Sequence, residues 1–273
     1  MSMQSIEARG LVLLGCGKMG SAMLEGWLAQ GLSASSITVI DPYPSARLEA
    51  LQAEGLHLNT PLPKAPAVCL LAVKPQMMAE ALPQIGDLAK ADTVFLSIAA
   101  GTSIDWFEGA LGRRAPIIRA MPNTPAAVGR GITALVGNAQ ASEAQMAMAE
   151  SLLSAVGQTV RIEDETMMDA ITGVSGSGPA YVFHMIETMA AAGVAEGLPE
   201  DLAMQLAKAT VAGAGVLAME ADEDPSQLRV NVTSPQGTTA AGLEVLMDHQ
   251  TGLPPLIKRT VAAAAERSRE LGK

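Results

Sequence analysis

The segment LVLLGCGKMGSAMLEGWLAQG, residues 11–31, limits the possible folds of this chain more than any other part of the sequence. An apolar run of strand length is followed by three glycines in the spacing G-x-G-x-x-G and then by a helical pattern. Gly15 permits a tight turn, Gly17 lets a phosphate approach the backbone, and Gly20 lets the helix pack closely on the strand. Free N–H groups at the helix start suit an anion. The pattern predicts a dinucleotide-binding unit.

Asp41 ends the next apolar run, 21 residues after the last of these glycines. A carboxylate there can accept hydrogen bonds from ribose hydroxyls and would repel a 2′-phosphate, so it favours NADH over NADPH. Ser45, Arg47 and Lys74 are near enough in sequence to leave NADPH open. A turn aspartate before Pro42, without a ligand, is the alternative interpretation.

Short apolar runs alternate with helical patterns through the first part of the chain. The strand candidates are residues 11–14, 37–40, 68–73, 94–98, 117–120, 131–136 and 159–162. The helices between them are expected near residues 20–30, 45–54, 77–88, 104–111 and 143–155. This alternation predicts a doubly wound α/β fold, with a parallel sheet covered by helices on both faces.

Strand signals stop at the acidic triplet EDE, residues 163–165. Only helices are expected beyond it, over residues 167–173, 179–197, 201–221, 225–232, 239–249 and 254–271. We therefore expect a nucleotide-binding domain of the Rossmann type over residues 1–162 and an all-α domain over residues 163–273.

Charge and composition exclude several classes of partner. The net charge of −10 argues against nucleic acid, because phosphate binding needs clustered Lys and Arg. Cys16 and Cys69 fit no metal-ligand spacing and no disulfide framework, so we expect no metal and a reducing cytoplasm. Residues 202–219 are the most membrane-like stretch, but they contain Lys208, and a helix buried in a protein or subunit interface is expected instead of a membrane span.

Three of the predicted strands end in turn-forming motifs, LAVKPQ, SIAAGTS and RAMPNTPAAVG. Ligands of doubly wound sheets lie beyond the carboxyl ends of the strands. Lys74 is therefore expected to point toward the cofactor region or the rim of the sheet. The small residues of SIAAGTS would let the chain pass close to a nicotinamide ring. Loop formation explains any one of these motifs, but it explains three together less well.

A hydroxyl-rich turn, SPQGTT, lies near the end of the chain at residues 234–239. Pro235 and Gly237 interrupt regular structure, and Thr238 or Thr239 begins a helix whose free N–H groups can bind an anion. From the residues alone, a threonine N-cap without a ligand is the favoured interpretation.

The motifs GCGKMG, LAVKPQ, MPNTPA, SGSGPAY and VTSPQGTT together resemble those of the pyrroline-5-carboxylate reductase family. The resemblance extends over residues 11–246, and its last two motifs are the specific ones. It implies a Rossmann domain followed by a helical domain that forms an intertwined homodimer, in some members assembled into a decamer. It implies reduction of 1-pyrroline-5-carboxylate to L-proline by NADH or NADPH, the last step of proline biosynthesis.

The resemblance also implies site residues. Those of the cofactor are Gly15, Cys16, Gly17, Lys18, Met19 and Gly20 in the turn, then Asn59, Ala72, Val73, Lys74 and Pro75, and beside them Ala99, Ala100 and Gly101. Ser234 and Thr239 would contact the substrate, with Asn231 and Glu165 close to the substrate or nicotinamide. The substrate carboxylate would bind Ser234 and backbone N–H groups of the turn that contains Gly237 and Thr238. The Thr239 hydroxyl would reach the ring nitrogen, and we expect it to orient the ring rather than transfer a proton.

Two positions depart from the family pattern. Gln236 replaces a usual glycine, so we expect the substrate turn to have a slightly different shape. Asp41 and Pro42 replace the small or basic residues that are frequent after the second strand, so both NADH and NADPH stay open as cofactors.

Three alternatives stay open. One is a reductase of another small cyclic imine. Another is a hydroxyacid dehydrogenase like 6-phosphogluconate dehydrogenase, but that chemistry needs a lysine on the interdomain helix, and Lys208 is the one lysine between residues 163 and 257. The third is a nucleotide-sensing Rossmann protein without turnover, which would be expected to lose the hydroxyls of Ser234 and Thr239.

Overall fold

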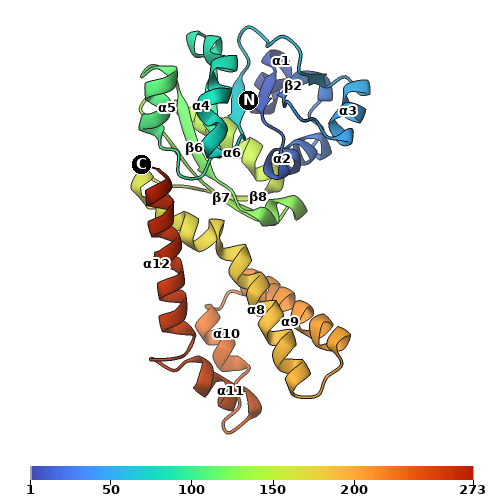
Figure 1. The fold of residues 1–273 in the computed structure, drawn as a ribbon, viewed down its shortest axis with the longest axis vertical. Coiled ribbons are helices and arrows are strands. Elements are labelled where there is room, and N and C mark those ends of the chain that lie inside the picture. The colour runs from blue at the N-terminus through green and yellow to red at the C-terminus, as the bar shows by residue number, and fades with distance from the viewer. Residues whose placement is uncertain (1, 273) are drawn as a thin grey trace. The chain divides into compact units, whose positions relative to one another are not determined.

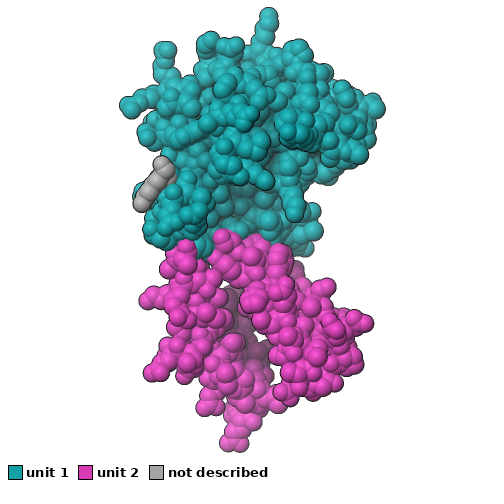
Figure 2. Space-filling view, viewed as in Figure 1, with its two compact units in different colours: residues 1–176, 264–273 teal, residues 177–263 magenta. Residues whose placement is uncertain are grey.

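The structure, a computed structural model, describes residues 2–272 and divides into two compact units. Unit 1 contains the residues up to Gly176 together with those from Ala264 onward, and unit 2 runs from Ser177 to Ala263 (Figure 2). The last turns of the C-terminal helix therefore belong with the N-terminal unit. The assignment of residues 163–273 to a single helical domain stays a prediction.

Unit 1 is built around a sheet of eight strands (Figure 1). They are β1 (Leu11–Leu14), β2 (Ile37–Ile40), β3 (His57–Leu58), β4 (Val68–Leu71), β5 (Val94–Ser97), β6 (Ile117–Met121), β7 (Gly131–Gly137) and β8 (Gly157–Arg161). Their order in the sheet is β3-β2-β1-β4-β5-β6-β7-β8. The chain winds outward from β1 in both directions, so the predicted doubly wound fold is confirmed.

Helices and single turns connect these strands. The helices are α1 (Ser2–Arg9), α2 (Lys18–Ala29), α3 (Ala46–Ala53), α4 (Met78–Ala81), α5 (Ile104–Leu111), α6 (Glu143–Leu153) and α7 (Met168–Ile171). The 3-10 segments are η1 (Ala34–Ser36), η2 (Pro75–Met77), η3 (Leu82–Lys90), η4 (Thr124–Val128), η5 (Ser154–Val156) and η6 (Glu165–Met167), and a π-helical turn, η7, spans Thr172–Gly176.

Both faces of the sheet are covered, because alternate residues of a strand point to opposite sides. Leu11 and Leu13 of β1 belong to a hydrophobic cluster that includes Trp27 of α2. Val12 and Leu14 belong to the cluster of the other face, which α4 and α5 complete. A four-residue strand with all its side chains buried is typical of a central parallel strand.

One pairing departs from the predicted parallel sheet. β6 and β7 are antiparallel, with Ala120 opposite Leu135. Only residues 122–130 join the two strands, whereas a parallel crossover needs a dozen residues or more. The short turn η4 therefore returns the chain in the opposite direction.

The sequence pattern does not predict three features of unit 1. Helix α1 is mostly polar and is anchored by the fully buried side chain of Ile6. Strand β3 has two residues, too few to show a periodicity. The helix expected over residues 77–88 is split into α4 and η3, because Pro83 in the first turn of η3 lacks an N–H group.

Helices joined by short loops make up unit 2 within the residues that the structure describes, and the helices agree with the prediction. It contains α8 (Gly178–Ala195), α9 (Glu200–Glu220), α10 (Pro225–Asn231), α11 (Thr238–Leu246) and the first part of α12 (Leu253–Leu271). Small residues let α8 and α9 approach closely, since a Cβ atom on Gly193 would lie 3.3 Å from the Cβ of Ala203. In the part of the chain that the structure describes, α9 is the one helix long and apolar enough to cross a bilayer, by length and composition only.

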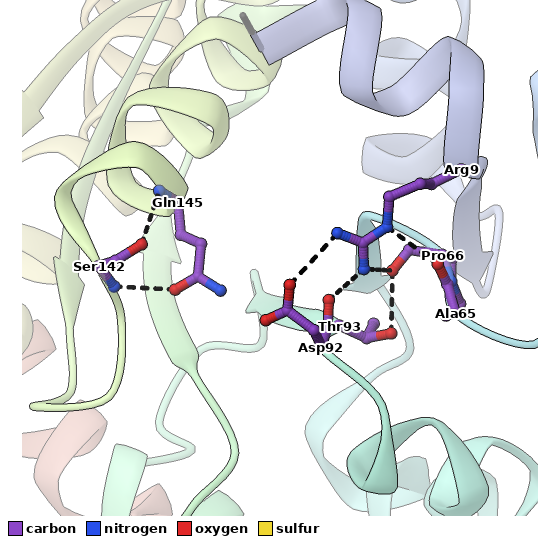
Figure 3. Close-up of polar contacts among 7 residues, drawn as sticks. All are labelled: Arg9, Ala65, Pro66, Asp92, Thr93, Ser142 and Gln145. Carbon is purple, nitrogen blue, oxygen red and sulfur yellow. Dashed lines mark hydrogen bonds and ion pairs between the residues drawn. The ribbon is translucent and has the colours of Figure 1, made fainter.

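A cavity of about 490 Å³ lies at the amino-terminal edge of the sheet, where β4 and β5 begin (Figure 3). Arg9 lines it and holds two loops together. Its Nε donates to the carbonyl oxygen of Ala65 (3.1 Å), and Nη2 donates to the carbonyl oxygens of Pro66 (3.2 Å) and Asp92. Nη1 also pairs with the Asp92 carboxylate at 3.4 Å.

The other side of this cavity is the start of α6. Ser142 Oγ accepts a hydrogen bond from the Gln145 backbone N–H, and the Gln145 side chain accepts one from the Ser142 N–H. Ser142 and Gln145 thus bond to each other, whereas Arg9 bonds to the two loops (Figure 3). The cavity therefore lies away from the predicted site, which belongs to the opposite, carboxyl edge of the sheet.

We expect Arg9→Ala to lower the free energy of unfolding by about 1–2 kcal/mol, because main-chain carbonyl groups of two loops lose their donor. The ion pair between Arg9 and Asp92 contributes little to the free energy of unfolding, because the Asp92 side chain is 80% exposed. Urea denaturation measures the loss. The matched control Asp92→Asn keeps the carbonyl contact and should change stability by less than about 0.5 kcal/mol. Equal losses in the two variants would contradict this account.

Candidate cofactor and substrate site

The turn between β1 and α2 has the geometry that the glycine spacing predicts. Gly15 has a φ of +85°, and a Cβ atom there would lie 2.7 Å from Val73 Cγ1. A Cβ atom on Gly20 would lie 2.8 Å from the Gly15 carbonyl oxygen. A Cβ atom on Gly17 would have no protein atom within 4 Å, so the space beside Gly17 is not filled by the protein. Gly15 and Gly20 are thus required by the fold, and Gly17 is free to admit a ligand.

The start of α2 can bind an anion. Gly17 is its N-cap residue and supplies no side-chain hydrogen bond, which leaves N–H groups of the first turn without an internal partner. Lys18 is exposed and Met19 is half-buried at the same end. A dinucleotide pyrophosphate fits a helix start of this kind, because both the N–H groups and the helix dipole favour negative charge.

Asp41 follows β2 and is bonded to the glycine turn. Its Oδ2 accepts a hydrogen bond from the Cys16 backbone N–H at 2.7 Å, and its Oδ1 accepts one from the Tyr43 N–H at 2.8 Å. Asn59, after β3, binds the Asp41 backbone twice, through its Oδ1 (2.9 Å) and its Nδ2 (2.8 Å). Asp41 and Asn59 therefore form one connected structure with the turn.

The loop after Asp41 contains an exposed ring and an engaged cation. Tyr43 is 86% exposed. The sequence pattern alone did not indicate this residue. Arg47 binds both carboxylate oxygens of Glu25, at 2.8 and 3.2 Å, and lies 3.5 Å from Glu54. The hydrogen bond from Arg47 lowers the pKa of Glu25. Arg47 is thus already paired with two carboxylates.

The predicted cofactor residues after β4 and β5 lie at the same edge of the sheet. The Ala72 N–H donates to the Leu14 carbonyl oxygen at 2.8 Å, so this loop begins beside the glycine turn. Lys74 is exposed at the start of η2. After β5, the Ala99 N–H donates to Ser97 Oγ at 3.2 Å, and Gly101 has a φ of +76°. The remaining predicted residues of these loops, Val73, Pro75 and Ala100, complete the two segments.

Glu165 also lies at this edge, in η6. Its Oε1 accepts hydrogen bonds from the Ile104 N–H at the start of α5 (2.9 Å) and from Nη1 of Arg119 in the middle of β6 (2.6 Å). The Arg119 side chain is 9% exposed, so this is a largely buried ion pair. No motif predicted a role for Arg119, although a cation inside the apolar strand IIRAM indicates that it needs an internal partner.

The loop after β6 is bound to the π-helical turn η7. Asn123 donates through Nδ2 to the Ser175 carbonyl oxygen (3.2 Å) and accepts through Oδ1 from the Ile132 N–H (2.9 Å). A Cβ atom on Gly176, the first glycine of the motif SGSGPAY, would lie 2.5 Å from Met121 Cε, so a larger residue there would displace the end of the Met121 side chain.

The predicted substrate residues other than Glu165 lie in unit 2, around the start of α11. The Gly237 N–H donates to the Ser234 carbonyl oxygen at 3.0 Å and closes the turn. Gln236 has a φ of +61°, a conformation that a glycine would adopt without strain. Thr238 opens α11, whose N-cap residue Gly237 supplies no side-chain bond. Thr239 follows it and is exposed, so its hydroxyl stands at the free end of the helix.

Asn231 is the remaining predicted substrate residue and ends α10. Its Oδ1 accepts a hydrogen bond from Gln227 Nε2 at 2.8 Å, one helical turn earlier. The two units place the predicted residues in two groups, the cofactor group with Glu165 in unit 1 and the hydroxyl turn in unit 2. Within the described residues, no group of His, Cys, Asp and Glu could hold a metal ion.

Neither cysteine should react with iodoacetamide in the native protein near neutral pH. Burial raises the pKa of the Cys16 thiol, and the charges of Asp41 and Glu25 raise it further against the opposing hydrogen bond with Ser21. Burial alone raises the pKa of Cys69. Because only the thiolate attacks, both thiols stay protonated and unreactive. Mass spectrometry should find two alkylations after denaturation and none before; a native adduct on Cys16 would contradict the burial of this turn.

Two protein families match the chain. Residues 165–271 match the family described as pyrroline-5-carboxylate reductase dimerisation, and residues 11–101 match the family described as NADP oxidoreductase, coenzyme F420-dependent. Among solved structures, a pyrroline-5-carboxylate reductase from Coxiella burnetii is similar with a TM-score of 0.90 and 32% identity, over 97% of this chain and 99% of that one. The Plasmodium falciparum pyrroline carboxylate reductase with NADP bound has a TM-score of 0.84 and 28% identity, over 98% and 99% of the two chains.

Curated relatives match along nearly the full length. The pyrroline-5-carboxylate reductase of Synechocystis is 42% identical over 267 residues, which cover 96% of this chain and 98% of the relative. That of Pseudomonas aeruginosa is 36% identical over 266 residues, covering 96% and 97%. With the glycine turn and the hydroxyl turn both in place, these relatives show that the chain belongs to the pyrroline-5-carboxylate reductase family.

Proposed function

We propose that this protein reduces 1-pyrroline-5-carboxylate to L-proline with NADH or NADPH, the last step of proline biosynthesis. The observation that carries the proposal is the hydroxyl turn at the start of α11, in a chain whose full length matches reductases of this name. An enzyme that reduces this imine must bind a small ring with one carboxylate, and free N–H groups beside hydroxyls are suited to that ligand.

The cofactor residues divide into three tasks. Gly15, Cys16, Gly17, Lys18, Met19 and Gly20 would hold the pyrophosphate at the start of α2. Asp41, kept in place by Asn59, would accept hydrogen bonds from the adenosine ribose while retaining its bonds to the turn. The loops after β4 and β5, with Ala72, Val73, Lys74, Pro75, Ala99, Ala100 and Gly101, would enclose the path to the nicotinamide.

Hydride chemistry belongs to the cofactor, which supplies a hydride for the imine carbon. The protein's residues bind and orient the substrate. The substrate carboxylate would bind Ser234 and the N–H groups of the turn at Gly237 and Thr238, and Thr239 Oγ1 would contact the ring nitrogen. Asn231 and Glu165 would lie near the bound rings. An imine is already electrophilic, particularly when protonated, so orientation alone can lower the barrier by several kcal/mol.

The protein self-associates through its helical region, whose family is named for dimerisation. Unit 2 presents large apolar side chains to solvent in a single copy, among them Phe183 of α8 (57% exposed) and Met219 of α9 (68% exposed). Burial of such a surface favours association. We propose that the self-associated form is a homodimer and that homodimers assemble further into a decamer. We place the protein in the cytoplasm. For the same reason, we propose that the apolar surface of α9 packs against another protein chain and does not cross a bilayer.

The direct test is reduction of 1-pyrroline-5-carboxylate by the purified protein, followed by the absorbance of NADH and NADPH. Turnover with either cofactor supports the proposal. Cofactor binding without turnover would point to another small cyclic imine, tested next, and then to a nucleotide-sensing protein. The hydroxyacid dehydrogenase alternative is disfavoured, because Lys208 is the one lysine between residues 163 and 257 and lies within α9.

Thr239→Ala should lower kcat by about 10- to 100-fold and leave the Kd of NADH unchanged, because the ring nitrogen loses its orienting partner. Thr239→Ser keeps a hydroxyl and is the matched control. Fluorescence titration of NADH and steady-state kinetics separate the two effects. If Thr239→Ala turned over like Thr239→Ser, Thr239 would have no role in orienting the imine.

Asp41→Ser should shift the ratio of kcat/KM toward NADPH, because the charge that repels a 2′-phosphate is removed. The shift should be modest, about tenfold, since Arg47 remains paired with Glu25 and offers the phosphate no free cation. Asp41→Asn removes the charge with less change of shape and should shift the ratio in the same direction. An unchanged ratio in both variants would place Asp41 outside the ribose site.

A further inference from the structure

The last two turns of α12 pack into unit 1 with a face of small residues. Ala265 and Ser268 are both 4% exposed, while Arg267 and Arg269 between and beside them are exposed. Ser268 Oγ donates a hydrogen bond to Asp169 Oδ1 at 2.6 Å, across 99 residues of sequence. A buried hydroxyl bonded to a carboxylate fixes the rotation of α12 at this point.

One turn further, the end of α12 touches the loop after β5. A Cβ atom on Gly101 would lie 3.1 Å from Leu271 Cβ, and a Cβ atom on Gly272 would lie 2.7 Å from the Gly101 carbonyl oxygen. The two backbones are therefore in contact, and a side chain at either glycine would push them apart. Gly101 belongs to the segment SIAAGTS, residues 97–103, which we call the β5 loop.

Asp169 connects this contact to the other end of the β5 loop. Asp169 is part of α7 and lies four residues after Glu165, which begins η6. The two residues are therefore about one helical turn apart. Glu165 accepts the N–H of Ile104, the residue that directly follows the β5 loop, and is held by Arg119. The contacts form a closed ring that runs from the β5 loop through the end of α12, Ser268 and Asp169 to Glu165 and back to Ile104.

This ring has no part in pairing the strands. The β5 strand is held by β4 and β6 on either side through Ser97, and the Ile98 N–H donates to the Leu71 carbonyl oxygen. Beyond Ile98 no strand pairing holds the β5 loop. The ring instead fixes the loop itself, at its middle through Gly101 and at its end through Ile104. Residues far away in sequence are thus used to hold a short segment of small residues at the carboxyl edge of the sheet.

We propose that the end of α12, through Ser268 and the contact of Leu271 and Gly272 with Gly101, positions the β5 loop and thereby the nicotinamide ring. The inference rests on the proposed function insofar as the β5 loop lies against the nicotinamide. Ser268 and Leu271 are positioning residues that act through the loop and do not touch the reacting atoms. A displacement of about 1 Å in such a loop is enough to slow a reaction about 100-fold.

The experiment uses Ser268→Ala in the full chain and compares two ligands. NADH carries the nicotinamide, whereas ADP-ribose has the same adenosine and pyrophosphate without it. We expect Ser268→Ala to raise the Kd of NADH by about threefold, to leave the Kd of ADP-ribose unchanged, and to lower the single-turnover rate of imine reduction by about tenfold. Arg267→Ala, on the exposed face of the same turn, is the matched control and should behave as wild type.

Two more variants separate the parts of the ring. Asp169→Asn retains Oδ1 as an acceptor for Ser268, so it should keep most of the wild-type rate. A chain that ends at Glu270 keeps the Ser268–Asp169 bond and removes the residues that contact Gly101. Like Ser268→Ala, it should have a raised Kd for NADH and an unchanged Kd for ADP-ribose. This chain also keeps the test decisive if Ser268→Ala does not fold.

The proposal is overturned if Ser268→Ala and the shortened chain bind NADH and react like Arg267→Ala. It is also overturned if they lose affinity for NADH and ADP-ribose in equal proportion, because a general loss of structure would produce that result. The binding comparison needs no turnover. A wild-type protein that fails to reduce 1-pyrroline-5-carboxylate would therefore remove the proposed function and still allow the ring to be tested.

Discussion

The close approach of α2 to the end of β1 is the constraint on which the carboxyl edge of the sheet depends. Gly15 and Gly20 leave no space for a side chain, since their Cβ atoms would lie 2.7 and 2.8 Å from neighbouring atoms. This contact fixes the start of α2 directly beyond β1 and brings the loop after β4 against the turn through Val73. A bulkier residue at either glycine would move the helix start away from the strand, and with it the N–H groups that can bind a phosphate.

Around this turn, the protein satisfies most polar groups of the edge with its own residues. Asp41 is bonded to the turn and to Tyr43, Asn59 is bonded to Asp41, and Glu165 is bonded to Arg119. Side chains that are already held lose little freedom when a ligand binds, so less of the binding free energy is spent on ordering them. The edge is thus arranged by internal hydrogen bonds, and the space beside Gly17 stays open among them.

Local patterns predicted the parts of this structure that local chemistry determines. The glycine spacing predicted β1 and α2, and the absence of strand patterns after residue 165 predicted the helices from α8 onward. Pairs distant in sequence were not predictable, because nothing near Ser268 indicates that Asp169 is its partner, 99 residues earlier. The same applies to Arg119, for which the sequence shows a buried cation but not the carboxylate, 46 residues away, that neutralises it. The direction of β7 was open to prediction, since its connection is too short for a parallel crossover.

The two units differ in how much apolar surface they bury by themselves, and this difference bears on the site. The hydrophobic clusters of unit 1 contain fully buried Trp, Phe, Leu and Ile side chains, whereas the buried cluster described in unit 2 consists of Ala190, Ala203 and Ala207. Three alanines remove little apolar area from water, while large side chains of α8 and α9 remain exposed. Unit 2 therefore needs the surface of another copy to reach the burial that a stable helical unit requires. Because the hydroxyl turn is part of unit 2, self-association and the order of the hydroxyl turn are expected to depend on the same buried surface.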